Sequence, residues 1–211
     1  MPVANVRYES RAKRASDVIG SVALLGVAAP VLVVAAAAVL LTMGSPVLYR
    51  DRRVGRAGRT FELLKFRTMR PLRPGETVPD SDHVRITRVG RVLRRTSIDE
   101  LPSLLNVLRG DMSLVGPRPL PVRYLDRYTA TQARRHDVKP GITGWAQVNG
   151  RNAVSWAEKF TLDVWYVDHS SLRLDLRILM MTVLGLLRRE GISYEGHATM
   201  PEFTGETGDR S

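Results

Sequence analysis

Two adjacent carboxylates, Asp99 and Glu100, stand at the start of a stretch with apolar residues at helical spacing. Acids at a helix start often serve as caps, and the string from Ser97 to Glu100 matches a capping box. Pro102 argues against simple capping, because a helix capped by Ser97 would set its ring against the Ile98 carbonyl. A helix that begins at or just after Asp99 leaves both acids beside free backbone N–H groups, where phosphate also binds. One acid could then attack a phosphorus atom while the other holds a metal ion.

Cationic residues surround this pair in the sequence. Arg94 precedes it closely, and Lys65 lies near the end of a strand-like stretch. Arg118 stands between two prolines, which restrict its backbone and lower the ordering cost of binding a ligand. Guanidinium groups suit paired recognition of phosphate oxygens. These three residues are candidates for binding substrate phosphates, and an ordinary solvated turn is the alternative for Arg118.

A second group of turn-forming residues follows. The strings Lys139–Trp145 and Asn149–Asn152 combine glycines with a tryptophan and with Arg151. They could frame a nucleotide, although turns and hairpin ends are the commoner use of such strings. The four histidines lack metal-ligand spacing, so we expect them at the surface or in packing.

The elements that position these residues begin with an uncharged apolar run from Val18 to Met43, broken by Pro30. A straight helix of this length would measure about 39 Å and could cross a hydrocarbon core of about 30 Å, but neither half could. Basic residues flank both ends, so the positive-inside tendency favours the cytoplasmic face for both. We predict a re-entrant or kinked hairpin. A tilted single span is the main alternative; the length of the run argues against a secretory signal.

Composition narrows the function classes. The chain has 211 residues, a formal charge of +11 and no cysteine, and arginine supplies 28 of its 32 basic residues. Disulfides and thiolate metal sites are therefore excluded. The charge implies a polyanionic neighbour: nucleic acid, an anionic leaflet or a phosphorylated substrate. Alternatives to an enzyme are a membrane-tethered nucleic-acid-binding protein, for which no recognised module is visible, and an inactive scaffold or partner subunit of an assembly complex.

We predict an α+β fold, mainly α, with a re-entrant membrane helix hairpin and a compact cytosolic domain that carries a small β-hairpin and interfacial amphipathic helices. This fold is implied by the family resemblance given below more than by periodicity. Residues 1–45 form the basic lead-in and membrane helix, 46–190 the catalytic domain, and 191–211 a polar, mobile tail. The last predicted helix has a wide apolar face and is either a core or an interfacial helix. The expected strands are Pro46–Val54 and Thr60–Phe66, and the expected helices are 84–93, 100–109, 119–136, 153–168 and 172–189.

Several strings, taken in order, closely resemble the bacterial sugar transferase family, the small monotopic phosphoglycosyl transferases. Each string is modest alone, but their order is highly specific, and the match covers about residues 11 to 187. This family commonly has serine before the helix-breaking proline, where this chain has Ala29. The matching strings are Lys13–Asp17, the proline-broken run, Lys65–Met69, Thr96–Pro102, Asn106–Pro119 and Lys139–Trp145.

The resemblance implies transfer of a sugar-1-phosphate from a UDP-sugar to a polyprenol phosphate, usually undecaprenyl phosphate, with release of UMP. This reaction is the first membrane step of surface glycan or exopolysaccharide synthesis. The resemblance also implies a place at the bacterial inner (plasma) membrane, with the catalytic domain on the cytoplasmic face. The expected partners are both substrates, the anionic membrane surface and glycosyltransferases of the same pathway, and no nucleic acid is expected.

The resemblance further assigns roles to residues. It implies that Asp99 is the nucleophile that forms a covalent phosphosugar intermediate, and that Glu100 helps to hold Mg²⁺. It places Lys65, Arg94 and Arg118 in the phosphate-binding site and implicates Arg151 in nucleotide binding.

Overall fold

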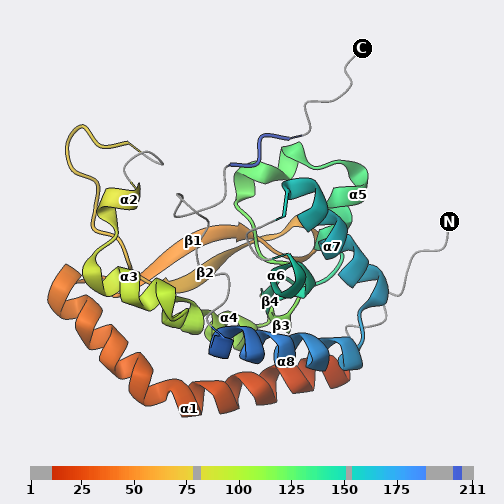
Figure 1. Ribbon diagram of the computed structural model, residues 1–211, viewed down its shortest axis with the longest axis horizontal. Coiled ribbons are helices and arrows are strands. Elements are labelled where there is room, and N and C mark those ends of the chain that lie inside the picture. The colour runs from red at the N-terminus through yellow and green to blue at the C-terminus, as the bar shows by residue number, and fades with distance from the viewer. Residues whose placement is uncertain (1–10, 78–81, 151–153, 189–201, 206–211) are drawn as a thin grey trace.

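The computed structural model describes residues 11–77, 82–150, 154–188 and 202–205 of the chain. A long helix, α1 (Arg11–Met43), runs along one side of the molecule, and α8 (Leu172–Arg188) lies against its N-terminal half (Figure 1). The β-hairpin and the shorter helices lie on one side of these two helices. The fold is therefore mainly helical with a small β-hairpin, as predicted.

The helix α1 continues through Pro30 without a reversal of the chain. Figure 1 shows it curving around the underside of the protein. A proline inside a helix removes one backbone hydrogen bond and bends the axis, which accounts for a curve without a break. Among the described helices, α1 alone is long and apolar enough to cross a membrane. The helix of the predicted membrane segment is present, but the tight hairpin is not a feature of this structure.

The predicted β-hairpin is confirmed. Strands β1 (Leu48–Val54) and β2 (Thr60–Phe66) pair antiparallel around a short 3-10 turn, η2 (Arg56–Gly58). The Asn106 side chain fixes the free edge of β2, because its Oδ1 accepts from the Leu64 amide at 3.0 Å and its Nδ2 donates to the Glu62 carbonyl at 2.7 Å. This fully buried asparagine holds the hairpin against the helix that follows the acid pair.

A second sheet was not predicted. Strand β3 (Ser113–Val115) pairs in parallel with β4 (Gly141–Thr143), which lies in a stretch expected to form turns. Glycines allow the backbones to meet: a Cβ on Gly116 would lie 2.3 Å from the Lys139 carbonyl oxygen, and one on Gly144 would lie 2.1 Å from the Gly116 oxygen. The glycines of this string therefore serve backbone packing, in line with the structural alternative.

The helices match the predictions unevenly. The expected helix at 153–168 is α7 (Trp156–His169), and that at 172–189 is α8. The region 84–93 holds two helices, α2 (Asp82–Arg85) and α3 (Arg88–Arg95). The region 100–109 begins as a 3-10 helix, η3 (Ile98–Ser103), and continues as α4 (Leu104–Arg109). The turn-rich region after β4 contains α6 (Trp145–Asn149).

The prediction of one helix over 119–136 is wrong. Three short pieces replace it: η4 (Val122–Arg127), α5 (Ala130–Ala133) and η5 (Arg134–His136). Thr129 starts a new helix through a capping box with Gln132, and Tyr128 before it is extended. The Tyr128 ring packs on Phe160 at 5.3 Å, so burial of this aromatic outweighs helical continuity.

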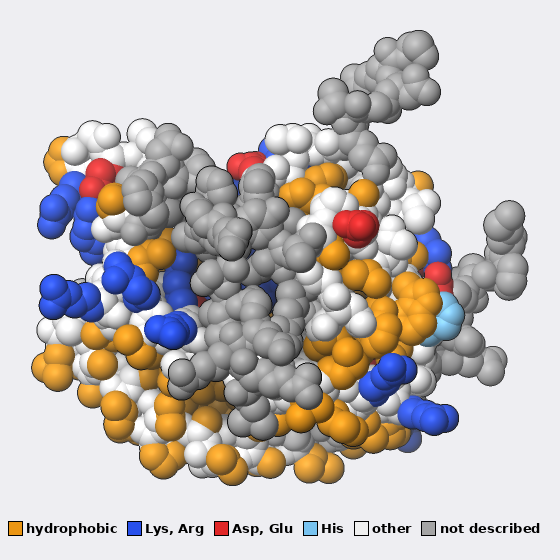
Figure 2. Space-filling view, viewed as in Figure 1, with side chains coloured by type: hydrophobic (Ala, Val, Ile, Leu, Met, Phe, Trp, Pro, Cys, Tyr) orange, Lys and Arg blue, Asp and Glu red, His pale blue; other side chains and the backbone are white. Residues whose placement is uncertain are grey.

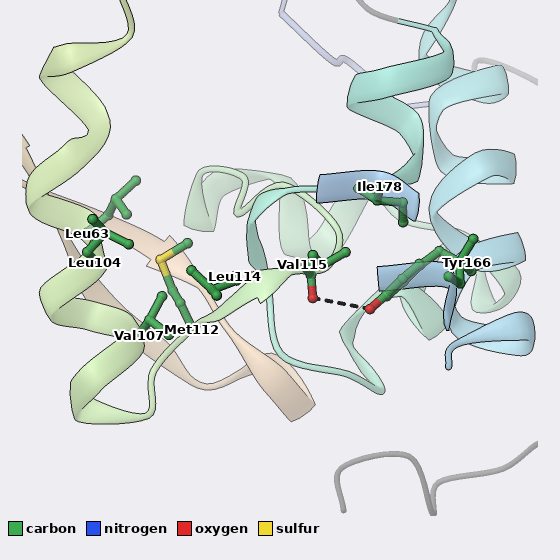
Figure 3. Close-up of a cluster of buried hydrophobic side chains, with 9 residues drawn as sticks. Leu63, Leu104, Val107, Met112, Leu114, Val115, Tyr166 and Ile178 are labelled. Carbon is green, nitrogen blue, oxygen red and sulfur yellow. Dashed lines mark hydrogen bonds between the residues drawn. The ribbon is translucent and has the colours of Figure 1, made fainter. Parts of the chain in front are cut away.

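The main core joins β2, α4, β3, α7 and α8. Figure 3 shows its side chains facing one another, with the Tyr166 hydroxyl donating to the Val115 carbonyl at 3.2 Å. A second core lies under the C-terminal half of α1 and contains Ala35, Val39, Phe66 and Leu93. The main core consists of Leu63, Leu104, Val107, Met112, Leu114, Val115, Tyr166, Leu174 and Ile178.

A band of apolar side chains is exposed along α1 and α8. In α1, Val27 is 83% exposed and Leu41 is 86% exposed. In α8, Ile178 is fully buried while Met180 is 63% exposed, so this helix has both a core face and an exposed apolar face. Figure 2 shows hydrophobic side chains along this edge of the molecule, with Lys and Arg gathered above one end of it, over α2 and α3.

Part of the predicted tail is described. Residues 202–205 lie against η4, where Glu202 pairs with Arg123 and Arg127. Phe203 is buried among aromatic rings, 5.6 Å from Tyr124 and 4.9 Å from Phe160.

Candidate active site

The acid pair lies in η3, between the hairpin and α4. Ser97 adopts a left-handed conformation at φ 57° and makes no capping bond through its side chain, which confirms that the capping box is not used. Pro102 lies inside η3, and the α-helix starts only at Leu104. The turn buries Asp99, which is 9% exposed, and leaves Glu100 half-buried.

Two cations bind the Glu100 carboxylate. Lys65 Nζ on β2 donates to Oε1 at 2.8 Å, and Arg118 Nη2 donates to the same oxygen at 2.6 Å. Arg118 Nη1 lies 3.3 Å from Oε2, which completes a two-pronged contact. Burial opposes ionisation of this acid, but Arg118 and Lys65 outweigh it and hold the pKa of Glu100 well below its usual range. Glu100 is therefore a fixed negative charge.

Asp99 has the opposite behaviour. Burial and the neighbouring charge of Glu100 raise its pKa to about 6, against the attraction of Lys65, Arg94 and Arg118. The surroundings thus shift the pKa values of these two adjacent carboxylates in opposite directions. A carboxylate with a raised pKa is a stronger base and nucleophile when it is ionised. The arrangement can hold an anionic phosphate beside a reactive oxygen.

Arg94 reaches the site from α3. Its Nε donates to the Thr68 hydroxyl at 3.0 Å, and its charge acts on Asp99. The helix is held close to the strand end, because a Cβ on Gly90 would lie 2.0 Å from the Thr68 carbonyl oxygen. Arg67, next in sequence, serves another purpose: its guanidinium donates to the Met43 and Gly44 carbonyls at the end of α1.

The structure thus brings together Lys65, Arg94, Asp99, Glu100 and Arg118 from four parts of the chain. Arg151 lies outside the described residues. The glycines of the Lys139–Trp145 string pack on Gly116 and so support the loop that carries Arg118.

One member of the acid pair, Glu100, could hold a divalent cation that arrives with a substrate. The described residues hold no group of three or more His, Cys, Asp or Glu side chains placed to bind a metal. Magnesium is usually held by one or two carboxylates together with substrate phosphates, and not by an all-protein cage. Glu100 could supply the carboxylate of such a site.

Charged residues at the start of α1 tie this helix to the domain. Lys13 Nζ donates to Asp175 Oδ2 at 2.5 Å and to the Val115 carbonyl at 3.3 Å. Asp17 Oδ1 accepts from the Ser113 hydroxyl and the Leu114 amide, both at 3.0 Å. These contacts hold β3, the strand that leads into the Arg118 loop.

Sequence reasoning missed a buried ion pair behind this loop. Arg135 donates to Asp163 Oδ2 from Nε at 3.0 Å and from Nη2 at 2.8 Å, and both side chains are almost fully buried. The two residues are 28 positions apart, on elements that only the fold brings together. No spacing or motif in the sequence marks them as partners.

Comparisons with known proteins identify the relatives of this chain. A family model described as bacterial sugar transferase matches residues 8–189. The chain is 53% identical over 199 residues to a protein of Bacillus subtilis named "Uncharacterized sugar transferase EpsL", covering 94% of this chain and 98% of that protein. It is 43% identical over 196 residues to the UDP-glucose:undecaprenyl-phosphate glucose-1-phosphate transferase of Caulobacter vibrioides, covering 88% of this chain and 73% of that one. The Escherichia coli protein of the same name is 40% identical over 181 residues, which cover 81% of this chain and 39% of that longer protein.

Proposed function

Because the chain belongs to the bacterial sugar transferase family and is a transferase, we propose that it moves a sugar-1-phosphate from a UDP-sugar to undecaprenyl phosphate. The names of its relatives support both substrates and make UDP-glucose and UDP-galactose the first donors to test. The observation that carries the proposal is the site itself: a buried Asp99 of raised pKa beside Glu100, which Lys65 and Arg118 neutralise.

In the first proposed step, an Asp99 carboxylate oxygen attacks the phosphorus that bears the sugar. The bond from that phosphorus to the bridging oxygen breaks, and UMP leaves with the electron pair. Asp99 then carries the sugar phosphate. Attack by an anion on a diphosphate needs the diphosphate charge neutralised and fixed in place, which Arg94, Arg118 and Lys65 are placed to do.

In the second proposed step, a phosphate oxygen of undecaprenyl phosphate attacks the same phosphorus. The bond from phosphorus to the Asp99 oxygen breaks, which restores the carboxylate and leaves the sugar on a lipid diphosphate. Mg²⁺ held by Glu100 and substrate phosphates would neutralise further negative charge in both steps. The lipid product is the starting material for glycosyltransferases that extend a surface glycan.

Contacts at the two ends of α1 support a proposal for the membrane arrangement. Lys13 and Asp17 bind the domain at one end, and Arg67 binds the Met43 carbonyl at the other. A helix whose two ends pack on one domain cannot span a bilayer with its ends on opposite sides. We therefore place the exposed face of α1, together with that of α8, in the cytoplasmic leaflet of the inner membrane, as a re-entrant or interfacial element.

This placement suits the lipid substrate. The Lys and Arg side chains over α2 and α3 would lie at the level of anionic headgroups, just above the apolar band (Figure 2). Undecaprenyl phosphate carries its phosphate at that level, so its reacting group would meet the site without leaving the membrane.

The test is UMP release by the full-length protein in detergent with Mg²⁺ and a panel of UDP-sugars, each with and without undecaprenyl phosphate. We expect a burst of about one UMP per protein without the lipid, as for a covalent intermediate, and continuous release with the lipid and the correct donor. Folded protein that releases no UMP from any donor would overturn the proposal. Continuous release without lipid would instead indicate hydrolysis.

A further inference from the structure

We infer that Arg135, held by Asp163, is a positioning residue for Arg118. The inference rests on the proposed role of Arg118 in binding substrate phosphate. Arg135 lies in η5 and Asp163 in α7, and neither residue belongs to the acid pair or its immediate cations. Arg135 contacts the backbone of the loop that carries Arg118.

The geometry forms one continuous chain of contacts. Asp163 Oδ2 accepts two bonds from Arg135, and Arg135 Nη2 also donates to the Arg118 carbonyl at 2.7 Å. The Arg118 guanidinium in turn donates to both oxygens of Glu100. The buried ion pair of Arg135 and Asp163 is thus connected to Glu100 through a single residue, Arg118.

The neighbours of Arg118 explain why its carbonyl needs this donor. Pro117 and Pro119 fix their own φ angles, and Pro119 has no N–H group. The orientation of the peptide group between Arg118 and Pro119 therefore depends on what its carbonyl oxygen binds. Fixing that oxygen fixes the direction in which the Arg118 side chain leaves the backbone.

The surroundings hold Arg135 in place. Its guanidinium lies 5.6 Å from the centre of the Phe160 ring and 5.8 Å from that of Tyr128, and the residue is 2% exposed. A guanidinium so enclosed keeps its orientation, and it transmits that orientation to the loop.

The same two elements supply a matched control. Arg134 and Asp168 form an ion pair between η5 and α7, with side chains 39% and 33% exposed. The variants to compare are Arg135→Met with Asp163→Leu, and Arg134→Met with Asp168→Leu, in the full-length protein. Replacing both members of a buried pair with apolar residues of similar volume often preserves stability, which separates positioning from folding.

The first readout is UMP release with undecaprenyl phosphate. We expect the Arg135/Asp163 variant to lose about 10- to 100-fold in kcat/KM for the donor at unchanged Tm, because small misplacements of a binding group have effects of this size. The Arg134/Asp168 variant should stay within about twofold of wild type. When Arg118 is already Ala, the Arg135/Asp163 change should cost nothing more. An equal loss with and without Arg118 would show a general structural role and overturn the inference.

The second readout does not depend on activity. Hydrogen exchange of the peptide that spans residues 114–122 should become faster in the Arg135/Asp163 variant and stay unchanged in the control. Wild-type protein that releases no UMP would refute the proposed function, while the exchange result would still decide whether the pair holds the loop. Unchanged exchange in a folded variant would refute the positioning role.

Discussion

At the scale of single residues, the proposed chemistry requires the ionised form of Asp99, and this form destabilises the fold. Burial and Glu100 raise its pKa to about 6, so the protein favours the neutral acid. Attack on phosphorus needs the ionised acid. Binding of a cationic metal ion near Asp99 would lower its pKa and so shift the balance towards ionisation.

The first prediction concerns pH. If Asp99 is the nucleophile, the rate of UMP release in the first turnover should rise as pH increases through about 6 and level off above about 7. The burst measured by rapid quench without lipid isolates this step. A first-turnover rate that is flat from pH 5 to 8 would contradict the assignment of Asp99.

The second prediction is that Asp99→Asn removes activity and stabilises the fold. The native protein binds the Asp99 proton more tightly than the unfolded chain, so stability falls as pH rises from about 4 to about 6. The amide carries no such cost, so Asn should raise the free energy of unfolding by about 1–3 kcal/mol at pH 8. The gain should vanish near pH 4.

Denaturant unfolding at both pH values checks this prediction. Asp137, an exposed carboxylate, provides the control, because Asp137→Asn should change neither activity nor stability appreciably. An Asp99→Asn variant that keeps wild-type UMP release would exclude Asp99 as nucleophile whatever its stability.

The third prediction concerns Glu100. Glu100→Gln keeps the shape of the side chain but removes the charge that a metal ligand needs, so the Mg²⁺ concentration for half-maximal activity should rise at least about tenfold. The exposed Glu62→Gln variant is the control. An unchanged Mg²⁺ titration would leave Glu100 only as the partner of Lys65 and Arg118.

At the scale of elements, the position of Arg94 depends on how closely α3 approaches the strand end. The contact between Gly90 and the Thr68 backbone leaves no room for a methyl group, since a Cβ there would lie 2.0 Å from a carbonyl oxygen. Backbone cannot yield as a flexible side chain can.

The fourth prediction therefore concerns Gly90→Ala. The added methyl group should push α3 away, break the bond from Arg94 to Thr68, reduce UMP release and cost about 1–3 kcal/mol of stability. Gly26→Ala in α1 is the control, because nothing lies within 4 Å of a Cβ there. Gly90→Ala with wild-type activity would show that Arg94 does not need this contact.

The elements also show where sequence patterns succeed. The strand Thr60–Phe66, predicted from residue types beside a glycine turn, and the helix predicted over 153–168 are both present, because local pattern and burial agree there. The region 119–136 has helical composition but a capping box at Thr129 inside it, and aromatic packing decides its shape. The acid pair and its cations could be predicted from motifs. The pair of Arg135 and Asp163 could not, because only tertiary packing joins them.

At the scale of the whole molecule, the proposed membrane placement depends on α1. Its apolar face is exposed while both of its ends bind the domain. The chain contains no cysteine, so single introduced thiols report topology without background.

The fifth prediction is that Arg11→Cys, before the apolar run, and Arg59→Cys, after it, lie on the same side. Neither thiol should react with a membrane-impermeant maleimide in intact spheroplasts, and both should react after lysis. A thiol introduced at the exposed Val27 should react poorly in both conditions, because lipid would cover it. Labelling of Arg11→Cys in intact cells would establish a spanning α1 and reject the re-entrant placement.

The pairing of Lys13 with Asp175 also has a consequence for how the chain is made. These partners are 162 residues apart, so a ribosome needs roughly 8–32 s to deliver the second after the first. During that interval α1 can meet the lipid while its ammonium group still lacks the carboxylate it will bind. The contact between α1 and α8 can therefore form only after synthesis of α8, and a chain that stops short of α8 would lack one of the contacts that hold its first helix to the domain.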